Sequence, residues 1–338
     1  MTQIFQKIHK FASETPDDCK MVVPITIASA ILTTQFTIVP SKLTYMNLKT
    51  LHAQRTLTFL LAVSLILLSF SAHLQAQQVK LMTYNIKNDL PKDGPNNWES
   101  RKGPMLKMLT QQAPALFGMQ EAFINQVEFL YSNMPHYQYI GVGRDNGALK
   151  GEFCAIMFDT IQFRVQEQGN FWLSATPQSP SLGWDAAYPR ICTYGLFENK
   201  LTQQKIWVFN THLDHKGVVA QRESCKLLLA KIQEINQQHY GVILMGDFNQ
   251  TAESAGIQLV AAQFEDSRSA VSTAAMLGGT FNGFDAAPAR QRIDYVFVQN
   301  LAVVSYDQVS DKMANSNYLS DHFPVTSTVY IRNQAASK

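Results

Sequence analysis

The chain has 338 residues, of which 46% are apolar and 16% charged, and its formal net charge at pH 7 is +2. A chain of this length can form one large domain or two smaller ones. A protein that binds long nucleic acid through its phosphates usually carries a large excess of positive charge. The composition shows no such excess, although a local basic patch is compatible with a neutral average.

The N-terminal segment differs in character from the rest of the chain. An uncharged apolar run over residues 56–72 follows Lys49 and Arg55 and ends near the small residue Ala76. A basic start, a short apolar segment and a small residue at the exit are typical of a secretory signal peptide. We therefore predict a signal peptide over residues 46–76, cleaved after Ala76, and a secreted or periplasmic protein.

The same segment leaves two alternatives open. A membrane anchor over residues 56–72 is the alternative to cleavage, because about 17 residues is the lower edge of a membrane-spanning helix. Residues 1–45 fit neither a signal peptide nor a domain, and they are either an upstream mis-called start before Met46 or a second membrane segment. After cleavage we expect no stable membrane partner.

The remainder, residues 77–338, is predicted to form one domain. The first 76 residues hold six of the 28 basic and three of the 26 acidic residues, so the remainder is close to neutral. It has no repeats, low-complexity segments or long linker, which favours a single domain. Its three cysteines match no metal motif, and we expect Cys154, Cys192 and Cys225 to be buried apolar side chains.

Strand-like and helix-like segments alternate along this domain. The predicted strands cover residues 78–86, 115–122, 136–143, 152–159, 163–173, 191–198, 204–213, 241–249, 292–298, 301–309 and 323–331. The predicted helices cover residues 104–112, 124–134, 218–235 and 252–263. The first helix is expected to start near Pro104, because proline favours the first helical turn. In the third, apolar side chains recur at helical spacing.

Several predicted strands stay apolar until their last residues and then end in Asn, Glu, His or Asp. Strands that are apolar on both faces need a covering layer on each side. We therefore predict a layered α/β domain, a sandwich of two β-sheets flanked by helices. In such a fold the polar side chains at the strand ends would gather at one rim of the sheets.

Polar residues at or next to the strand ends form the candidate site: Asn85, Glu121, His212, Asp214, Asp247, Asn249, Asp294, Asp321 and His322. Taken singly, an Asn or Asp in such a place usually caps a turn. Taken together, carboxylate and amide oxygens at one rim are the ligands that Mg²⁺ or Mn²⁺ prefers. Crowded carboxylates without a cation would repel one another and lose hydration, so a metal is the simplest interpretation.

The motifs that carry these residues are, in order, TYNI, MQEA, NTHLDH, GDFN, RIDYV and SDHFPV. Together they resemble the endonuclease/exonuclease/phosphatase family, which includes pancreatic deoxyribonuclease, neutral sphingomyelinases, inositol polyphosphate 5-phosphatases and nocturnin-like deadenylases. The resemblance covers about residues 79–331, and the stretches FWLSATP and TFNGF resemble bacterial secreted members near the deadenylase branch. It implies a four-layered α/β sandwich with two packed, mostly antiparallel sheets. It also implies hydrolysis of a phosphoester by direct attack of water, with Mg²⁺ or Mn²⁺ as cofactor.

The resemblance implies roles for the acidic and amide residues. Glu121 and Asn85 resemble the main metal site, and Asp321 resembles a further metal ligand. Asp247 resembles the residue that aligns and deprotonates the attacking water. Asn249 is similar to the residue beside it that holds the phosphate or the metal.

The two histidines resemble donors to the phosphoryl group. His322 would hydrogen-bond a phosphoryl oxygen, and Asp294 would hold that ring in the correct tautomer and favour its charged form. His212 resembles a second donor to the transition state. These roles suit phosphoryl transfer, which requires neutralisation of the charge that grows on the phosphoryl oxygens and an in-line nucleophile.

Substrate contacts are expected from arginines outside this group. A guanidinium can bind two phosphate oxygens at once, which makes Arg190 the favoured contact and Arg144 a second candidate. A surface role is the alternative for Arg144 and for Arg101. Asp214, where family members vary, is a further candidate substrate contact, and His215 is interpreted as structural.

The sequence therefore predicts a Mg²⁺- or Mn²⁺-dependent phosphoester hydrolase that acts as a monomer on a small molecule or on single-stranded nucleic acid. One alternative is a 3′–5′ exoribonuclease or other nuclease of the deadenylase type, which would bind oligonucleotides with a steep salt dependence. The non-enzymatic alternative is a catalytically silent binding module on the same fold. That alternative usually requires lost ligands, whereas every core position here is filled.

Overall fold

The computed structural model describes one short N-terminal stretch and most of the predicted domain. The described residues are 53, 55–64, 78–285, 289, 291–314 and 317–331. The chain divides into two compact units, Met1–Ala62 and Val63–Lys338. Residues 55–64 are helical, and the predicted extension and most of the predicted signal peptide lie outside the described residues. No described helix is both long enough and apolar enough to cross a membrane.

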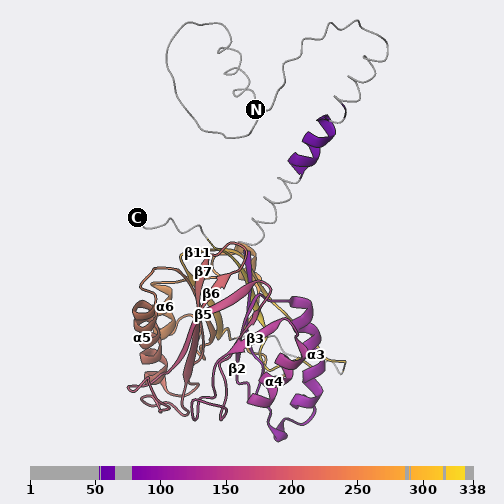
Figure 1. The fold of residues 1–338 in the computed structure, drawn as a ribbon. Helices are drawn as coiled ribbons and strands as arrows, with labels where there is room; N and C mark the ends of the chain where they lie inside the picture. Colours follow the sequence, from indigo (N-terminus) through magenta and orange to yellow (C-terminus); the bar gives the residue numbers. More distant parts are fainter. Residues whose placement is uncertain are drawn as a thin grey trace, which may run out of the picture. The chain divides into compact units, whose positions relative to one another are not determined.

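The larger unit contains two six-stranded β-sheets (Figure 1). The first has the strand order β11-β12-β1-β2-β4-β3. Its strands are β1 (Gln78–Asn85), β2 (Leu116–Gln120), β3 (Tyr137–Ile140), β4 (Ile156–Asp159), β11 (Leu301–Gln308) and β12 (Val325–Ile331). Strands β1 and β2 run parallel, and the other neighbouring pairs run antiparallel.

The second sheet has the strand order β5-β6-β7-β8-β10-β9. Its strands are β5 (Phe163–Trp172), β6 (Ile191–Asn199), β7 (Lys205–His212), β8 (Gly241–Asp247), β9 (Glu265–Asp266) and β10 (Asp294–Gln299). Here β7 and β8 run parallel and the remaining pairs antiparallel. Both sheets are therefore mostly antiparallel, as predicted.

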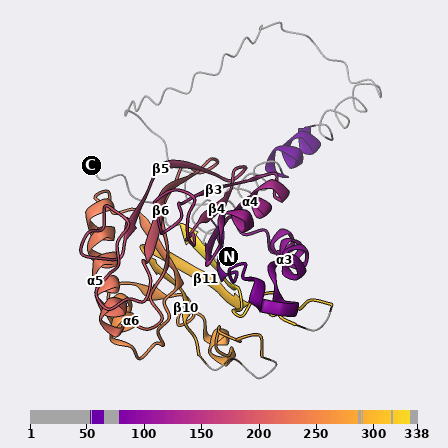
Figure 2. The same ribbon diagram turned by 90° about the horizontal axis from the view of Figure 1, so that it is seen from below.

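Helices cover the outer face of each sheet, with α3 and α4 on one side and α5 and α6 on the other (Figure 2). Their bounds, with those of two short 3₁₀ helices, are α3 (Trp98–Gln112), α4 (Ile124–Asn133), α5 (Val218–Ile235), α6 (Ala255–Ala261), η1 (Pro91–Asn96) and η2 (Ser272–Met276). The order of layers is helix, sheet, sheet, helix. This confirms the predicted four-layered α/β sandwich.

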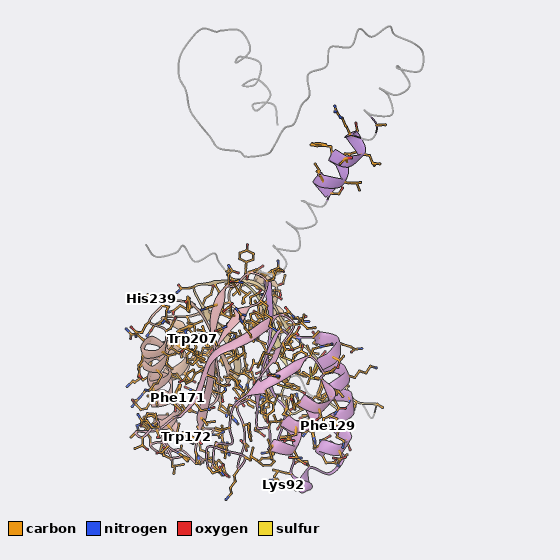
Figure 3. The ribbon with its side chains drawn as sticks, in the orientation of Figure 1. Lys92, Phe129, Phe171, Trp172, Trp207 and His239 are labelled. Atoms are coloured by element: carbon orange, nitrogen blue, oxygen red, sulfur yellow. The ribbon has the colours of Figure 1, made fainter. Side chains whose placement is uncertain are left out.

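Side-chain alternation along the strands builds three apolar layers. Leu81 of β1 and Ile243 of β8 pack between the two sheets, whereas Tyr84 of β1 faces α3 and α4. Trp207 and Phe171 belong to the layer that packs against α5 and α6 (Figure 3). A fully buried side chain of this size contributes about 1.5–3 kcal/mol to folding. The central strands are thus held on both faces, which fixes the position of their ends.

The start of the first long helix differs from the sequence prediction. Helix α3 begins at Trp98, and Asn97 caps it by accepting a hydrogen bond from the Ser100 N–H. Pro104 lies inside the helix, where its missing N–H removes one helical hydrogen bond. The helix continues through Pro104 because the turn before it buries Trp98 and Arg101.

The strand register brings the predicted site residues to one rim. Asp247 ends β8, and it is paired with His212 at the end of β7 and with Asp294 at the start of β10. In the other sheet Asn85 ends β1, and Glu121 directly follows the neighbouring β2. Within each sheet, residues far apart in sequence therefore become neighbours through strand pairing.

Candidate active site

One carboxylate oxygen links the two sheets at this rim. Asp247 Oδ2 accepts a hydrogen bond of 3.0 Å from Asn85 Nδ2, which also donates to Glu121 Oε1 at 3.1 Å. The same Asp247 oxygen lies 3.5 Å from His212 Nε2 and 3.7 Å from His322 Nε2. Two imidazoles, one amide and one carboxylate therefore meet at a single point.

The backbone around Asp247 holds this oxygen in place. Gly246 has φ +149°, and a Cβ there would lie 2.0 Å from Thr211 O, so glycine is required at this close approach. Asn249 N donates to Asp247 Oδ1 at 2.9 Å. Burial and then the Asp294 carboxylate raise the pKa of Asp247 to about 7, which is the range that suits a general base at neutral pH.

His322 is held by a carboxylate and is charged at neutral pH. Its Nδ1 lies 2.9 Å from Asp294 Oδ2. The start of β10 is fixed in turn by Thr280, whose Oγ1 accepts from the N–H groups of Ile293 and Asp294. Burial lowers the pKa of His322, but the Asp294 and Asp247 carboxylates outweigh it and raise the pKa to about 10. The imidazolium can therefore donate a hydrogen bond to an anionic oxygen in the cavity.

His212 has the opposite charge state. Burial and the guanidinium groups of Arg190 and Arg144 lower the pKa of His212 well below its ordinary value. Asn249 Nδ2 lies 3.0 Å from His212 Nε2, so Nε2 accepts and the ring proton lies on Nδ1. That Nδ1 has no hydrogen-bond partner among the described residues. It is free to donate to a bound ligand.

Two further carboxylates converge on a lysine beside this group. Lys87 Nζ lies 3.6 Å from Glu121 Oε2 and 3.6 Å from Asp321 Oδ2. Burial opposes ionisation of Glu121, but Lys87, His322 and the hydrogen bonds from Asn85 and Asn88 together outweigh it and hold the pKa of Glu121 below its ordinary value. Lys87, Glu121 and Asn249 have φ of +58°, +61° and +51°. Such conformations are strained for residues other than glycine, and they cluster at functional sites.

These carboxylates fit a hard divalent cation. Glu121 and Asp321 already face one positively charged atom, and carboxylate oxygens are the donors that Mg²⁺ and Mn²⁺ prefer. A second buried group, Asp247, Asp294 and His322, has one ligand atom per residue within 4.8 Å of one another and could hold a metal ion. Because Asp294 already binds the His322 ring, that group is better described as an aspartate–histidine pair facing Asp247.

The site groups line one cavity of about 530 Å³. Predicted residues in its wall are Glu121, Arg144, Arg190, His212, Asp247, Asn249, Asp321 and His322. Asn85 and Asp294 stand directly behind the wall, bonded to Asp247 and His322. Asp214 also stands behind the wall, bonded to Arg190. The structure thus brings every predicted site residue to the wall of this cavity or directly behind it.

Two arginines form a polar part of the wall. Arg144 Nη1 pairs with Glu152 Oε2 at 2.5 Å, and Arg190 Nε lies 3.3 Å from Asp214 Oδ2. Both guanidinium groups lie beside the half-exposed ring of Tyr188, at 5.3 and 6.0 Å from its centroid. Arg144 Nε and Arg190 Nη1 are buried without a hydrogen-bond partner among the described residues. They can donate to an anionic or hydroxylated ligand.

Asp214 is placed differently from the sequence prediction. Five protein donors surround its buried carboxylate: the N–H groups of Ala187, Tyr188, Lys216 and Gly217, and Arg190 Nε. Burial would raise the pKa of Asp214, but these hydrogen bonds outweigh it and lower the pKa to about 2. With its oxygens occupied, Asp214 orients Arg190 and does not contact the cavity.

Two other residues also differ from their expected places. Arg101 is fully buried and neither on the surface nor in the cavity, because its guanidinium donates to the main-chain oxygens of Ile86 at 2.5 Å and Lys87 at 3.0 Å. Arg101 is therefore a structural residue that anchors the segment after β1.

His215, interpreted as structural, lines the cavity, where its ring stacks on Tyr188 at 6.0 Å between centroids.

A family model described as the Endonuclease/Exonuclease/phosphatase family matches residues 82–322. The chain belongs to this family. The match covers all the predicted site residues, from Asn85 to His322. Members of the endonuclease/exonuclease/phosphatase family are phosphoester hydrolases.

Solved structures agree with this membership, and one curated protein is similar to part of the chain. An endonuclease/exonuclease/phosphatase family protein from Bacteroides thetaiotaomicron is 33% identical, with a TM-score of 0.72 over 77% of this chain and 98% of that chain. A mannosyl-6-phosphatase from Bacteroides thetaiotaomicron is 35% identical, with a TM-score of 0.69 over 75% of this chain and 100% of that chain. The uncharacterized protein L388 of Acanthamoeba polyphaga mimivirus is 28% identical over 159 residues, which are 45% of this chain and 59% of that protein. The chain thus spans less than two thirds of the mimivirus protein.

Lys87, Tyr188 and Glu152 line the cavity of this family member but are not among the predicted site residues. Lys87 directly follows the TYNI motif, and Tyr188 precedes Arg190 by two positions, so both lie next to residues that were already predicted. Glu152 lies in a loop after Gly151 and has no comparable signal, because loop geometry alone carries it to Arg144.

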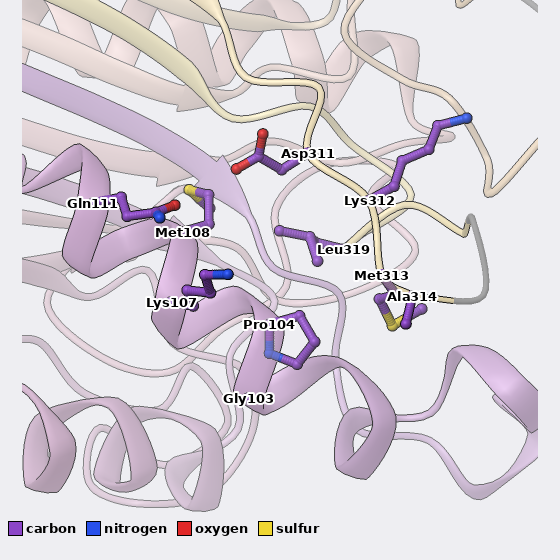
Figure 4. Close-up of a pocket in the computed structure, with 10 residues that line it drawn as sticks. All are labelled: Gly103, Pro104, Lys107, Met108, Gln111, Asp311, Lys312, Met313, Ala314 and Leu319. Atoms are coloured by element: carbon purple, nitrogen blue, oxygen red, sulfur yellow. The ribbon is translucent and has the colours of Figure 1, made fainter.

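A second cavity of the endonuclease/exonuclease/phosphatase domain has a different character. It measures about 450 Å³ and lies between α3 and residues 311–314 and 319 (Figure 4). Its described lining combines the apolar Met108, Met313 and Leu319 with Lys107 and Lys312, and includes none of the predicted site residues. The chemistry of the family is therefore assigned to the rim cavity.

Proposed function

We propose that this protein is a divalent-metal-dependent hydrolase of small phosphoesters that works by direct attack of water. The observation that carries the proposal is the position of Asp247 Oδ2, which lies 3.5 Å from His212 Nε2 and 3.7 Å from His322 Nε2. A buried carboxylate with a raised pKa suits proton abstraction from water. Two imidazoles beside it suit hydrogen bonding to phosphoryl oxygens.

Each side chain then has a distinct task. Asp247 accepts the proton of the attacking water, and Asn85 holds the accepting oxygen in place. His322, charged because of Asp294, donates to a phosphoryl oxygen and offsets part of its negative charge. His212, which is neutral, donates through its free Nδ1–H. Fixed donors of this kind stabilise charge that develops in the transition state.

Glu121 and Asp321 are the residues that would hold a divalent cation. When bound, such a cation supplies positive charge that neutralises the phosphate ester and favours attack at phosphorus. Asn85 Nδ2 orients the Glu121 carboxylate through its hydrogen bond of 3.1 Å. Asn88 N donates to the other Glu121 oxygen at 3.3 Å. The carboxylate is therefore held in one orientation by donors from outside the ligand pair.

The cavity supports a small, polar substrate. Its volume of about 530 Å³ lies within the range of small-molecule sites, about 300–1,000 Å³. Arg144, Arg190 and Glu152 place donors and an acceptor in the same wall, with the Tyr188 ring beside them. Mixed donors and acceptors beside an aromatic ring suit a hydroxylated leaving group. The mannosyl-6-phosphatase that is 35% identical makes sugar phosphates the first substrates to test.

The test is Asp247→Asn in a phosphate-release assay with sugar phosphates and an aryl phosphodiester, in Mg²⁺ or Mn²⁺ and in chelator. We expect wild-type activity only with metal, and a loss of about 10³-fold in kcat for the variant, because a general base contributes about 10²- to 10⁴-fold. Asp307→Asn, on the exposed face of β11, is the matched control and should retain full activity. Full activity of Asp247→Asn, or undiminished wild-type activity in chelator, would contradict the proposal.

A parallel series of assays with single-stranded oligonucleotides at several salt concentrations distinguishes a small-molecule hydrolase from a nuclease. For a small-molecule enzyme we expect weak cleavage of oligonucleotides and little change of KM with salt. A nuclease would instead lose affinity steeply between low and moderate salt, because each phosphate contact releases counterions. Efficient cleavage with that salt response would replace the small-molecule proposal.

A further inference from the structure

Lys87 is held in an unfavourable backbone conformation. Its φ of +58° is a left-handed conformation that residues with a side chain rarely adopt. Three contacts fix its main chain: Lys87 N donates to Asn85 Oδ1 at 3.1 Å, and Lys87 O accepts from Arg101 Nη2 at 3.0 Å and from Gln126 Nε2 at 2.9 Å. Arg101 and Gln126 are fully buried. Glycine would adopt this conformation without strain. A lysine held here against that strain indicates that its side chain has a function.

The side chain carries an ammonium group to the centre of the proposed metal ligands. Lys87 Nζ lies 3.6 Å from Glu121 Oε2 and 3.6 Å from Asp321 Oδ2, and the side chains of the three residues are 21%, 15% and 14% exposed. Two carboxylates that face each other with so little solvent repel strongly unless a cation lies between them. The ammonium group supplies that cation from within the chain.

We infer that Lys87 is a built-in counter-cation of the Glu121–Asp321 pair, which neutralises the pair in the metal-free protein and must leave it before a divalent cation can bind. The inference rests on the proposed function, because it takes Glu121 and Asp321 as metal ligands. Lys87 is a positioning residue: it keeps the two carboxylates facing one point.

This arrangement couples metal affinity to the lysine. A divalent cation gains two carboxylates but must break two ion pairs, so the observed metal affinity is lower than the ligands alone would give. The displaced ammonium group remains tethered by a flexible four-carbon stem at the wall of the cavity. It then adds positive charge on the side of the cavity where the phosphate group binds.

The experiment measures metal binding and metal-free stability in Lys87→Met, which keeps most of the stem and removes the charge. By calorimetric titration with Mn²⁺ alone, we expect the dissociation constant to fall about tenfold, because no ammonium group has to be displaced. In chelator, we expect the Tm of the variant to fall by about 2–4 °C, because the two carboxylates lose their shared cation. Lys87→Gly relieves the backbone strain and should show the same tighter binding, which guards against a folding defect of Lys87→Met.

Lys226→Met is the matched control, because Lys226 pairs with Glu223 at 3.0 Å on the exposed side of α5. It should leave both the dissociation constant and the Tm unchanged. Unchanged or weaker Mn²⁺ binding in both Lys87 variants, with normal binding by the wild type, overturns the inference and leaves the proposed function standing. Absence of Mn²⁺ binding in every variant and in the wild type overturns the metal dependence of the proposed function, and the inference with it.

Discussion

The two histidines of the cavity are chemically identical side chains with opposite charge states. His322, which precedes β12 of the first sheet, is surrounded by carboxylates that raise its pKa to about 10. His212, at the end of β7 in the second sheet, is buried beside Arg190 and Arg144, and its pKa lies well below the ordinary value. Yet both imidazoles approach the same Asp247 oxygen, at 3.7 and 3.5 Å.

The difference between these two sides of the cavity shows how the fold assigns roles. Both rings are buried, and burial disfavours the charge on each. What separates them is the charged group that shifts each pKa most after burial, the Asp294 carboxylate for His322 and the Arg190 guanidinium for His212. A charged and a neutral donor on either side of one carboxylate give a site with one strong and one weaker contact to a phosphoryl group.

Asp294→Asn should break this contrast and have the largest effect on kcat of any single substitution at the site. Without the carboxylate, His322 loses the main group that favours its charged form, so its pKa should fall. We expect kcat to drop by about 10³- to 10⁴-fold, the order found when the carboxylate partner of a catalytic histidine becomes an amide. Steady-state kinetics and an NMR titration of the imidazoles measure the two effects.

The pH dependence of stability provides a second check on Asp294→Asn, because it reports on the pKa of His322. Because the pKa of His322 is raised from 6.5 to about 10, its pairing with Asp294 stabilises the protein fully below about pH 6.5 and is lost as the pH rises through about 10. The destabilisation by Asp294→Asn should therefore shrink at alkaline pH. If His322 still titrates near pH 10 in the variant, the assigned cause of its raised pKa is wrong.

His212→Gln should have an intermediate effect, because it removes the neutral donor and leaves the charged one. We expect kcat to fall by about 10²-fold, as is typical when one donor to a transition state is lost. The pKa of His322 should change little. His239→Gln, in an exposed turn before β8, is the control, and pH profiles of kcat/KM compare the three proteins. A loss as large as that of Asp294→Asn would contradict the weaker role of His212.

Much of the fold was predictable because the central elements have strong patterns. Helix α5 spans Val218–Ile235, as the apolar spacing indicated, and β8 has a long apolar run before its acidic end. Helix α3 shows where local signals fail. Pro104 is typical of a helix start, but the actual start depends on burial of Trp98 and Arg101 against residues distant in sequence. The two-residue β9 is too short to leave any periodic signal.

The candidate site likewise contains residues that the sequence pattern predicts and residues that it does not. Asn85, Asp247 and His212 each end a buried strand, so the common rim follows from the strand pattern. Lys87 and Glu152 lie in loops, where the direction of a side chain depends on φ values and partners that no periodicity encodes. Asp214 illustrates the converse, since this acidic residue close to a strand end is fully occupied by main-chain donors from its own and another loop and by Arg190.

Asp214→Asn should have the smallest effect on the reaction. It tests the environment of the neutral His212, because Asp214 orients Arg190, which lowers the pKa of His212. Asp214 acts on the substrate only through Arg190, and we expect kcat/KM to fall by about tenfold or less.

Asp214→Asn should lower the free energy of unfolding by about 2 kcal/mol at neutral pH, because a charged acceptor with several donors is lost. Since the pKa of Asp214 is lowered from 3.8 to about 2, the ionised carboxylate stabilises the fold above about pH 4, and this contribution is lost as the pH falls through about 2. Urea denaturation at neutral pH and at about pH 3 should show the difference from wild type shrinking. Asp185→Asn, which loses a cap of α5 but leaves Arg190 in place, should destabilise the protein without altering kcat/KM.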